Sequence, residues 1–304
     1  MESEESAKAM IRNIFPQIKI NEITLAGEGM DSRAYFVNGK MVFRFPKNPT
    51  ARKSLGVEIA LLPEIQKHVD LPTPSFQWIG READTLLFAG YPRIPGEELS
   101  ACWLQLTGKE QADVLHTLAQ FFEQIHAFPV PQARALGVPE QKDRRIYKGD
   151  FVQVANDLHD LLPQKMEKFT SQLYDALMKN KRNFEYSPVL LQADFSPGHI
   201  FYSMKEQRVT GVIDFGDVGI GDPAFDLMYL YGYYGWAFIR HFLTYLPPSA
   251  FDQKILRKKL RWYLIHNTME DIWMGQDRKN EEMKTWAVSL LLKQVQQMQT
   301  EEFY

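Results

Sequence analysis

Asn38 and Gly39 constrain the fold of this chain more than any other short segment. They lie between two apolar runs, residues 34–37 and 41–45, and both residues tolerate the positive φ angles that a tight hairpin turn requires. An earlier apolar run, residues 23–26, is separated from the first of these by a loop that contains glycine. The first hundred residues therefore predict a small antiparallel sheet with a glycine loop in its first turn.

The pattern changes beyond this sheet. Apolar residues recur at helical spacing from residue 50 to about residue 69, which predicts a helix that carries Glu58 and packs on the sheet. Residues 86–89 predict another strand, and the proline and glycine residues of segment 90–96 predict an extended connector. A boundary between a strand-rich part and a helical part is therefore expected near residue 95.

The second part of the chain is predicted to be mainly helical. Apolar residues three and four apart indicate amphipathic helices at residues 109–128 and 150–179. Residues 188–191 predict a strand, and a hairpin is expected to pair residues 200–203 with residues 209–213. The remainder of the chain is again helical in pattern and rich in Trp, Tyr and Met, so a short acidic hairpin interrupts a large helical part.

Composition excludes several classes of protein. The 304 residues carry a net charge of −3, and 45% of them are hydrophobic, as in a globular protein of about two domains. There is no basic cluster typical of nucleic-acid binding, and no apolar run approaches the roughly 20 residues that cross a bilayer. The N-terminus is acidic and lacks a secretory signal, which predicts a cytoplasmic protein. The lone cysteine, Cys102, excludes an intrachain disulfide.

Two carboxylates mark the predicted hairpin region. Asp194 follows the strand at residues 188–191, and Asp214 ends the second arm of the hairpin, with Asp217 just beyond it. A carboxylate at the end of a hydrophobic strand is costly to bury unless it is paired or binds a metal. Asp214 is therefore a candidate oxygen ligand for Mg²⁺, and the alternative is an Asp that begins an Asx-turn before Gly216.

The segment DFSPGH at residues 194–199 bends the chain so that His199 can face Asp194. An Asp near an acceptor hydroxyl can orient it or take its proton, and the imidazole can supply a nitrogen ligand to a metal held by Asp214. A purely structural histidine is the alternative. The loop at residues 27–32 is a third element, because Gly27 and Gly29 let phosphates approach backbone N–H groups.

The loop also offers the hydroxyl of Ser32, although two glycines between strands are common in any hairpin. The loop lacks the ending of a Walker A motif and no helix follows it directly, which argues against P-loop and Rossmann folds. The order of these parts along the chain is typical of a kinase-like phosphotransferase. It consists of a glycine loop, a cation on the third strand, a helical Glu, a hinge and then two aspartates.

At this point the chain resembles the aminoglycoside phosphotransferase family, from about residue 20 to residue 275, and looks most like its 2″-phosphotransferase branch. Macrolide phosphotransferases share the Pro-Gly-His turn. The matching stretches are residues 43–47 (FRFPK), 88–91 (FAGY), 194–200 (DFSPGHI) and 213–217 (IDFGD). Asp222, Pro223 and Asp226, later in the sequence, also match.

The resemblance implies an α+β, two-lobed protein-kinase-like fold. A small antiparallel-sheet lobe at residues 1–95, with a hinge near residues 88–96, would bind the nucleotide, and residues 96–304 would form the catalytic and acceptor-binding lobe. Asp194 matches the catalytic Asp, and His199 and Asp214 match the Mg²⁺ ligands. Glu58 matches the helix residue that pairs with the phosphate-binding cation.

The glycine loop is expected to cover the phosphates of ATP or GTP. The hinge offers groups for the purine, around Phe88, Tyr91 and Ile94.

The sequence departs from the family pattern at two positions. Arg44 stands where the family usually has Lys, with Lys47 three residues later, and we favour Arg44 over Lys47 as the phosphate-binding cation. Gln192 replaces the His two residues before the catalytic Asp, and an amide can donate and accept hydrogen bonds as that imidazole does.

The expected function is Mg²⁺-dependent transfer of a nucleotide γ-phosphoryl group to a hydroxyl of an aminoglycoside antibiotic, by a monomer with no nucleic-acid or membrane partner. A macrolide kinase, a kinase for an amino alcohol or sugar, and a non-catalytic nucleotide-binding protein are the alternatives. The candidate residues for binding the acceptor are Asp217, Asp222, Glu270 and Asp271, with Trp236 and Trp273 as stacking surfaces. For each carboxylate, a position on a solvated helix face with no role in binding is an equally good interpretation.

Overall fold

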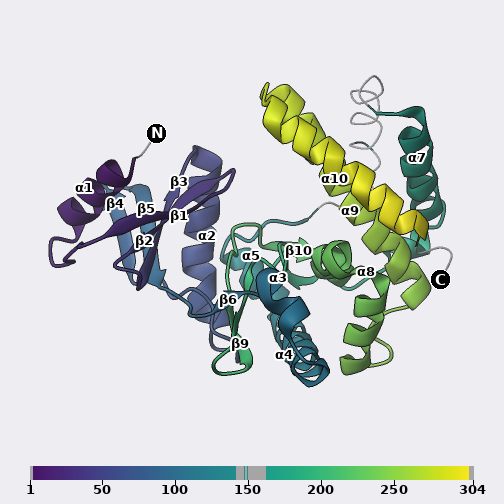
Figure 1. Cartoon of the computed structure of the whole chain (residues 1–304), viewed down its shortest axis with the longest axis horizontal. Helices are drawn as coiled ribbons and strands as arrows, with labels where there is room; N and C mark the ends of the chain where they lie inside the picture. Colours follow the sequence, from purple (N-terminus) through teal and green to yellow (C-terminus); the bar gives the residue numbers. More distant parts are fainter. Residues whose placement is uncertain (1–2, 142–146, 148, 150–161, 301–304) are drawn as a thin grey trace. The chain divides into compact units, whose positions relative to one another are not determined.

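The computed structural model describes residues 3–141, 147, 149 and 162–300 (Figure 1). The chain divides into two compact units. Unit 1 consists of Met1–Val138 and Pro197–Val218, and unit 2 consists of Pro139–Ser196 and Gly219–Tyr304. Each unit is therefore built from two separate segments of the sequence, and the chain crosses from one unit to the other at three points.

Unit 1 contains the predicted antiparallel sheet, which has five strands. Their order is β1-β2-β3-β5-β4, with β1 at Ile23–Glu28, β2 at Ser32–Val37, β3 at Met41–Pro46, β4 at Trp78–Glu82 and β5 at Thr85–Pro92. The turn between β2 and β3 places Asn38 and Gly39 at φ angles of 54° and 65°, as the hairpin prediction requires. The three strands expected before residue 46 are confirmed.

Strand β5 continues where the sequence predicted an extended connector. Gly90 and Tyr91 pair with Phe43 and Val42 of β3, so the strand runs on to Pro92 before it ends. A Cβ atom on Gly90 would lie 2.6 Å from a ring carbon of Phe43, so the glycine serves close packing across the sheet. The glycine therefore marks a crowded position within the strand, and the connector begins only after it.

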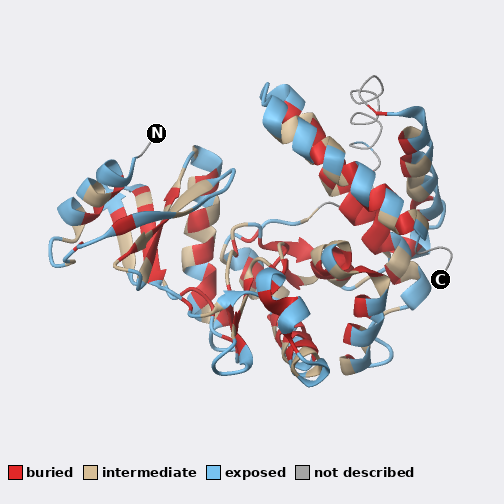
Figure 2. Cartoon of the chain, viewed as in Figure 1, coloured by how far each residue is buried: buried red, intermediate tan, exposed pale blue. Residues whose placement is uncertain are grey.

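Two helices cover the sheet (Figure 1). Helix α1 (Glu4–Ile14), which the sequence did not predict, is capped by Ser3 and buries Ala7 and Ile11 in the aromatic core of the sheet. Helix α2 (Pro49–Ile65) confirms the predicted helix, is capped by Asn48, and packs Leu55 against β5. Buried residues form a stripe along α2 (Figure 2), and Glu58 lies on that stripe with 0% exposure.

The remainder of unit 1 joins the sheet to a second hairpin. This part comprises β6 (Glu97–Glu98), α3 (Leu99–Cys102), η1 (Trp103–Gln105), α4 (Gly108–His126), α5 (Val130–Ala135), β8 (Ile200–Ser203) and β9 (Arg208–Val212). The predicted hairpin is the β8–β9 pair, and Thr210 Oγ1 donates to the Pro95 carbonyl at 2.5 Å. Gly96, at φ 119°, fits against the Tyr202 carbonyl, where a Cβ atom would lie 2.6 Å from the oxygen.

Unit 2 is mainly helical. It contains α7 (Gln164–Met178), η2 (Lys181–Phe184), β7 (Val189–Leu191), β10 (Gly219–Gly221), η3 (Pro223–Leu227), α8 (Met228–Phe242), η4 (Leu243–Tyr245), α9 (Gln253–Asp277) and α10 (Glu281–Thr300). Strands β7 and β10 pair antiparallel, and α9 packs against α10, α7 and α8. Residues 150–161 of the helix expected at 150–179 lie outside the described residues. Among the residues that are described, no helix is both long and apolar enough to cross a membrane.

Candidate active site

Arg44 links two carboxylates inside unit 1. Its Nη1 donates to both carboxylate oxygens of Glu58, at 2.7 Å and 2.8 Å, and its Nη2 donates to Asp214 Oδ1 at 3.3 Å. The side chain of Glu58 is fully buried and that of Arg44 is 13% exposed, whereas that of Asp214 is 40% exposed. One guanidinium therefore joins a buried carboxylate on α2 to a partly exposed carboxylate that follows β9.

The charges in this cluster stabilise one another. Burial by itself would lower the pKa of Arg44, but the neighbouring carboxylates Glu58 and Asp214 raise it above its ordinary value, so the guanidinium stays charged. Burial would likewise raise the pKa of Asp214, but Arg44 and then His199 outweigh it and hold that pKa below 3.8. Asp214 is therefore an ionised oxygen donor at neutral pH.

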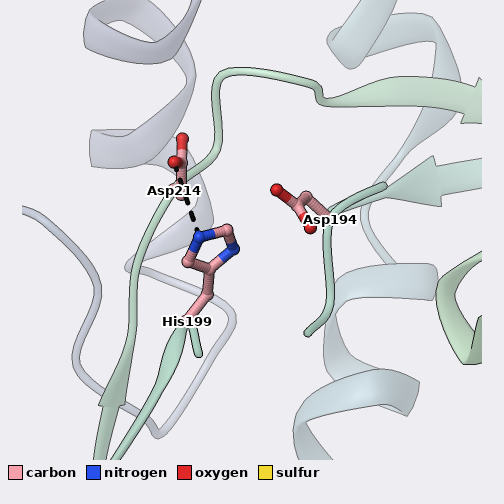
Figure 3. Close-up of side chains that lie close together, drawn as sticks. All are labelled: Asp194, His199 and Asp214. Atoms are coloured by element: carbon pink, nitrogen blue, oxygen red, sulfur yellow. Dashed lines mark ion pairs between the residues drawn. The ribbon is translucent and has the colours of Figure 1, made fainter. Parts of the chain in front are cut away.

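His199 and Asp214 lie at the open end of the β8–β9 hairpin. The Ile213 N–H donates to the His199 carbonyl at 2.9 Å, which extends the ladder by one step beyond the pairing of Ile200 with Val212. His199 Nε2 is 3.8 Å from Asp214 Oδ2, the ion pair drawn as a dashed line in Figure 3. Both side chains are partly exposed, so a nitrogen and an oxygen donor reach solvent side by side, which fits a divalent cation.

The backbone at Asp214 adopts the left-handed region, with φ of 61°. Asp tolerates this conformation better than most residues, and the Gly216 N–H donates to Asp214 Oδ1 at 3.4 Å. The segment IDFG thus turns sharply after β9, and Phe215 is buried while its N–H donates to Glu58 Oε1 at 3.3 Å. Asp217, a candidate acceptor residue, is exposed.

Asp194 belongs to unit 2 and follows β7 by three residues. Its N–H donates to the side-chain Oε1 of Gln192 at 2.9 Å, and Ala193 between them has a φ of 66°. Asp194 is partly buried. The chain itself keeps Asp194 within five residues of His199, a backbone path of at most about 18 Å.

The glycine loop holds Lys47. Lys47 Nζ donates to Glu28 Oε1 and to the Gly29 carbonyl, both at 2.7 Å, and Arg33 also pairs with Glu28. Arg33 and then Lys47 lower the pKa of Glu28 to about 2. Of the two candidate cations, Arg44 therefore contacts Glu58, and Lys47 contacts the loop that contains Gly27, Gly29 and Ser32.

The three hinge candidates are buried side chains. Phe88 packs among Phe43 and Phe45 of the sheet core, and Tyr91 packs edge-on against Phe76. Ile94 is 8% exposed, and the Arg93 N–H donates to the Lys40 carbonyl. In this structure these side chains build the interior of unit 1, so a purine in the hinge would be met mainly by backbone groups.

Asp222 is enclosed in unit 2, which corrects the expectation that it faces a substrate. Its Oδ2 accepts from Lys259 Nζ at 2.5 Å and from the Tyr263 hydroxyl at 2.9 Å, and its Oδ1 accepts from the Ala224 N–H at 3.0 Å. Asp222 is 6% exposed. Lys259 was not among the residues predicted from the sequence, although a lysine among the apolar residues of α9 indicates a buried partner.

The remaining acceptor candidates are partly exposed. Glu270 Oε2 lies 3.6 Å from His266 Nδ1, and burial, followed by the charge of Glu270, raises the pKa of Asp271 to about 6. Trp236 faces the guanidinium of Arg257 at 5.7 Å. Trp273 is half-buried on the same helix as Glu270 and Asp271. These four residues stay candidates for an acceptor surface on unit 2.

Comparisons with known proteins identify the family. Residues 22–252 match the family described as the phosphotransferase enzyme family. The structure is similar to the GDP and kanamycin complex of APH(2″)-IIIa, with 28% identity, a TM-score of 0.88, and coverage of 95% of this chain and 97% of that chain. It is also similar to the GDP complex of wild-type aminoglycoside 2′-phosphotransferase-IIIa, with 27% identity, a TM-score of 0.88, and coverage of 96% and 98%.

A macrolide 2′-phosphotransferase from Brachybacterium faecium shares the fold, with 17% identity, a TM-score of 0.71, and coverage of 93% of this chain and 97% of that one. The expected resemblance and the expected α+β, protein-kinase-like fold are confirmed. Because the family match covers most of the chain, the protein belongs to the phosphotransferase enzyme family and is an enzyme that transfers phosphoryl groups.

Proposed function

We propose that the protein transfers the γ-phosphoryl group of a nucleoside triphosphate to a hydroxyl group of an aminoglycoside. The observation that carries this proposal is the arrangement of Arg44 between Glu58 and Asp214. A buried carboxylate fixes the guanidinium, and the guanidinium keeps donors directed toward a partly exposed carboxylate. Phosphoryl transfer depends on such fixed charges, because it requires positioning and charge stabilisation more than covalent chemistry by the protein.

The nucleotide would be bound by residues up to about residue 95, with a hinge near residues 88–96. Arg44 binds the phosphates, since its planar guanidinium can keep Glu58 while a second edge meets phosphate oxygens. The glycine loop covers the phosphates with backbone N–H groups, and Lys47 holds that loop in shape through Glu28. Residues 96–304 would supply the catalytic loop and the acceptor surface.

His199 and Asp214 would hold Mg²⁺, and Asp194 acts on the acceptor. The bound ion would neutralise charge on the nucleotide phosphates. Asp214 contributes an ionised oxygen and His199 a ring nitrogen, and both are accessible to solvent in unit 1. Asp194 orients the acceptor hydroxyl or takes its proton as the γ-phosphoryl group is transferred in line.

An aminoglycoside is proposed as the acceptor because a relative at 28% identity is described with GDP and kanamycin bound. An aminoglycoside is a polycation, so its site needs carboxylates and flat apolar surfaces. Asp217, Glu270 and Asp271 are accessible carboxylates, and Trp236 and Trp273 are the stacking candidates. The GDP in that relative also supports GTP as a donor, with ATP as the second donor to test.

The test is a transfer assay on the purified full-length protein with GTP and with ATP. The acceptor panel contains aminoglycosides, macrolides and amino alcohols, and mass spectrometry records which acceptor gains a phosphoryl group. We expect aminoglycosides to be phosphorylated in the presence of Mg²⁺ and transfer to stop when EDTA is added. Transfer to macrolides or amino alcohols alone would overturn the aminoglycoside proposal, and nucleotide binding without transfer to any acceptor would overturn the enzymatic one.

Asp194→Ala is the matched variant for this assay. It should abolish transfer while leaving nucleotide affinity within about twofold, because Asp194 is proposed to act on the acceptor rather than on the nucleotide. Unchanged transfer by Asp194→Ala would remove Asp194 from its assigned role without touching the assignment of the acceptor.

A further inference from the structure

The loop that carries Asp194 obtains its hydrogen bonds from side chains. Strand β7 ends its pairing with β10 at Leu191, opposite Gly219, so the N–H groups that follow lie beyond this ladder. A buried N–H without a partner is costly, and the chain must therefore satisfy these groups by other means. The three consecutive N–H groups of Gln192, Ala193 and Asp194 all donate to side-chain oxygens.

Asp226 accepts the first two of these hydrogen bonds. Its Oδ1 accepts from the Ala193 N–H at 2.7 Å and its Oδ2 from the Gln192 N–H at 3.3 Å. Asp226 lies in η3 and is 3% exposed, so its carboxylate is shielded from water and each bond to it is strengthened. Both oxygens of one carboxylate thereby hold two successive residues of the loop.

The side chain of Gln192 accepts the third of these hydrogen bonds. Its side-chain Oε1 receives the Asp194 N–H at 2.9 Å, and the whole residue is 2% exposed. Gln192 is thus held by Asp226 through its backbone and holds Asp194 through its side chain. The chain turns between them at Ala193, whose φ of 66° is unfavourable for a residue with a Cβ atom and needs support from its surroundings.

We propose that Gln192 is a positioning residue for the transfer reaction: its side-chain amide accepts the Asp194 N–H and so sets the place of the Asp194 carboxylate, while Asp226 holds the two N–H groups that precede it. This inference rests on the proposed function for its kinetic consequence. It also assigns a role to the amide at the position where the family usually has an imidazole. Gln192 supplies an acceptor for the Asp194 N–H, so the substitution preserves the geometry of the loop and does not by itself indicate an inactive protein.

The first test measures transfer by Gln192→Ala. Displacement of a reacting group by about 1 Å can lower a rate a hundredfold, so we expect kcat to fall by about ten- to a hundredfold. The KM for the nucleotide should stay within about twofold, because the proposed nucleotide contacts lie elsewhere in the chain. Gln192→His, which offers a ring nitrogen as acceptor, should recover most of the loss, whereas Gln192→Leu, which fills similar space without an acceptor, should not; recovery by both would mean a role in packing alone.

Gln294→Ala is the matched control. Gln294 is also a buried glutamine of unit 2, is 5% exposed, and accepts one hydrogen bond through Oε1, from Thr268 Oγ1 at 3.0 Å. It should lower the melting temperature about as much as Gln192→Ala does and leave kcat unchanged. If the two alanine variants lower kcat equally, the positioning role of Gln192 is wrong.

The second test does not need a substrate. Hydrogen exchange resolved to single amides should find the Asp194 N–H protected in the wild-type protein, with exchange faster by about tenfold or more in Gln192→Ala and unchanged in Gln294→Ala. Asp226→Asn should accelerate exchange at residue 192 or at residue 193, because Asn keeps one acceptor oxygen and its NH₂ faces the other backbone donor. Equal protection of these amides in all variants would overturn the inference.

The two tests separate this inference from the proposed function. If the wild-type protein transfers no phosphoryl group to any acceptor, the proposed function fails, and the exchange data still decide whether the two side chains hold the loop. If transfer occurs and Gln192→Ala leaves kcat unchanged, the proposed function stands and the positioning role falls.

Discussion

Each unit of this protein contains a buried ion pair, and the two pairs differ in what surrounds them. In unit 1, Arg44 pairs with the fully buried Glu58, and a second edge of the guanidinium reaches Asp214, which is 40% exposed. In unit 2, Lys259 pairs with Asp222, and both side chains are less than 8% exposed. The Tyr263 hydroxyl and the face of Tyr186 also contact this second pair.

The difference separates a structural pair from a pair that can bind a ligand. A buried ion pair is by itself weak evidence for either role, because desolvation offsets much of the Coulomb attraction. The pair in unit 1 lies beside a second carboxylate, Asp214, which is partly exposed, so a ligand can reach the charges. The pair in unit 2 is enclosed by its own neighbours, and its charges serve the local fold around η3.

The largest expected effect follows from neutralising Asp214, the partly exposed carboxylate beside the pair in unit 1. Asp214→Asn should lower turnover by about a thousandfold, because the proposed Mg²⁺ site would lose its ionised ligand, which is worth several kcal/mol. Asn tolerates the left-handed backbone at this position, so the melting temperature should change little. Steady-state kinetics with a parallel thermal melt measure both quantities. A variant that unfolds instead would place Asp214 with the structural pair.

Breaking the enclosed pair should affect stability and not function. Lys259→Met leaves Asp222 buried without its cation, which should lower the free energy of unfolding by about 3 kcal/mol. Urea denaturation measures this loss, and nucleotide affinity measured below the unfolding transition should be unchanged. A loss of nucleotide affinity with unaltered stability would erase the distinction between the two pairs.

Asp271 represents a third situation, a half-buried acid next to another acid. Burial and then Glu270 raise its folded pKa to about 6 from an ordinary 3.8. The folded state therefore binds a proton that the unfolded state releases between these values, so this group favours folding at low pH and the benefit is lost as pH rises through about 6. Asp271→Asn should thus stabilise the protein by about 1 kcal/mol near pH 7.5, after allowance for solvent screening.

The control for Asp271→Asn is the pH dependence itself. The gain in melting temperature should shrink as pH falls below about 6 and vanish below about pH 3, where the wild-type carboxyl is protonated in both the folded and the unfolded state. A gain that does not depend on pH would mean that the substitution acts through packing and that folding does not raise the pKa of Asp271.

The sequence predicted the elements that depend on local patterns. The Asn38-Gly39 turn, the helix that carries Glu58 and the β8–β9 hairpin follow from turn chemistry and periodicity, and all are present. The sequence did not reveal that β5 continues through Gly90, because this glycine serves packing against Phe43, a residue far away in the sequence.

The contacts of the candidate site likewise include some that the sequence predicted and some that it did not. The family resemblance predicted that Glu58 pairs with the phosphate-binding cation, and the structure joins Glu58 to Arg44 directly, but the contact between Arg44 and Asp214 was not predicted. The sequence could not show that Asp222 is neutralised by Lys259, or that Asp226 holds the loop before Asp194, because these contacts join residues more than thirty positions apart. Pairing at such distances is decided by tertiary packing, which leaves no periodic trace in the sequence.

The most direct test of the central claim, that Arg44 binds the nucleotide phosphates, is a titration with a fluorescent triphosphate. The double variant Arg44→Gln with Glu58→Gln keeps a neutral hydrogen-bonded pair and should weaken triphosphate binding about 30-fold, since a hydrogen bond to a charged group is worth about 2 kcal/mol. Lys47→Gln should weaken it less than about fivefold, as expected for an exposed pair. Unchanged affinity in the double variant, with a large loss in Lys47→Gln, would contradict the account.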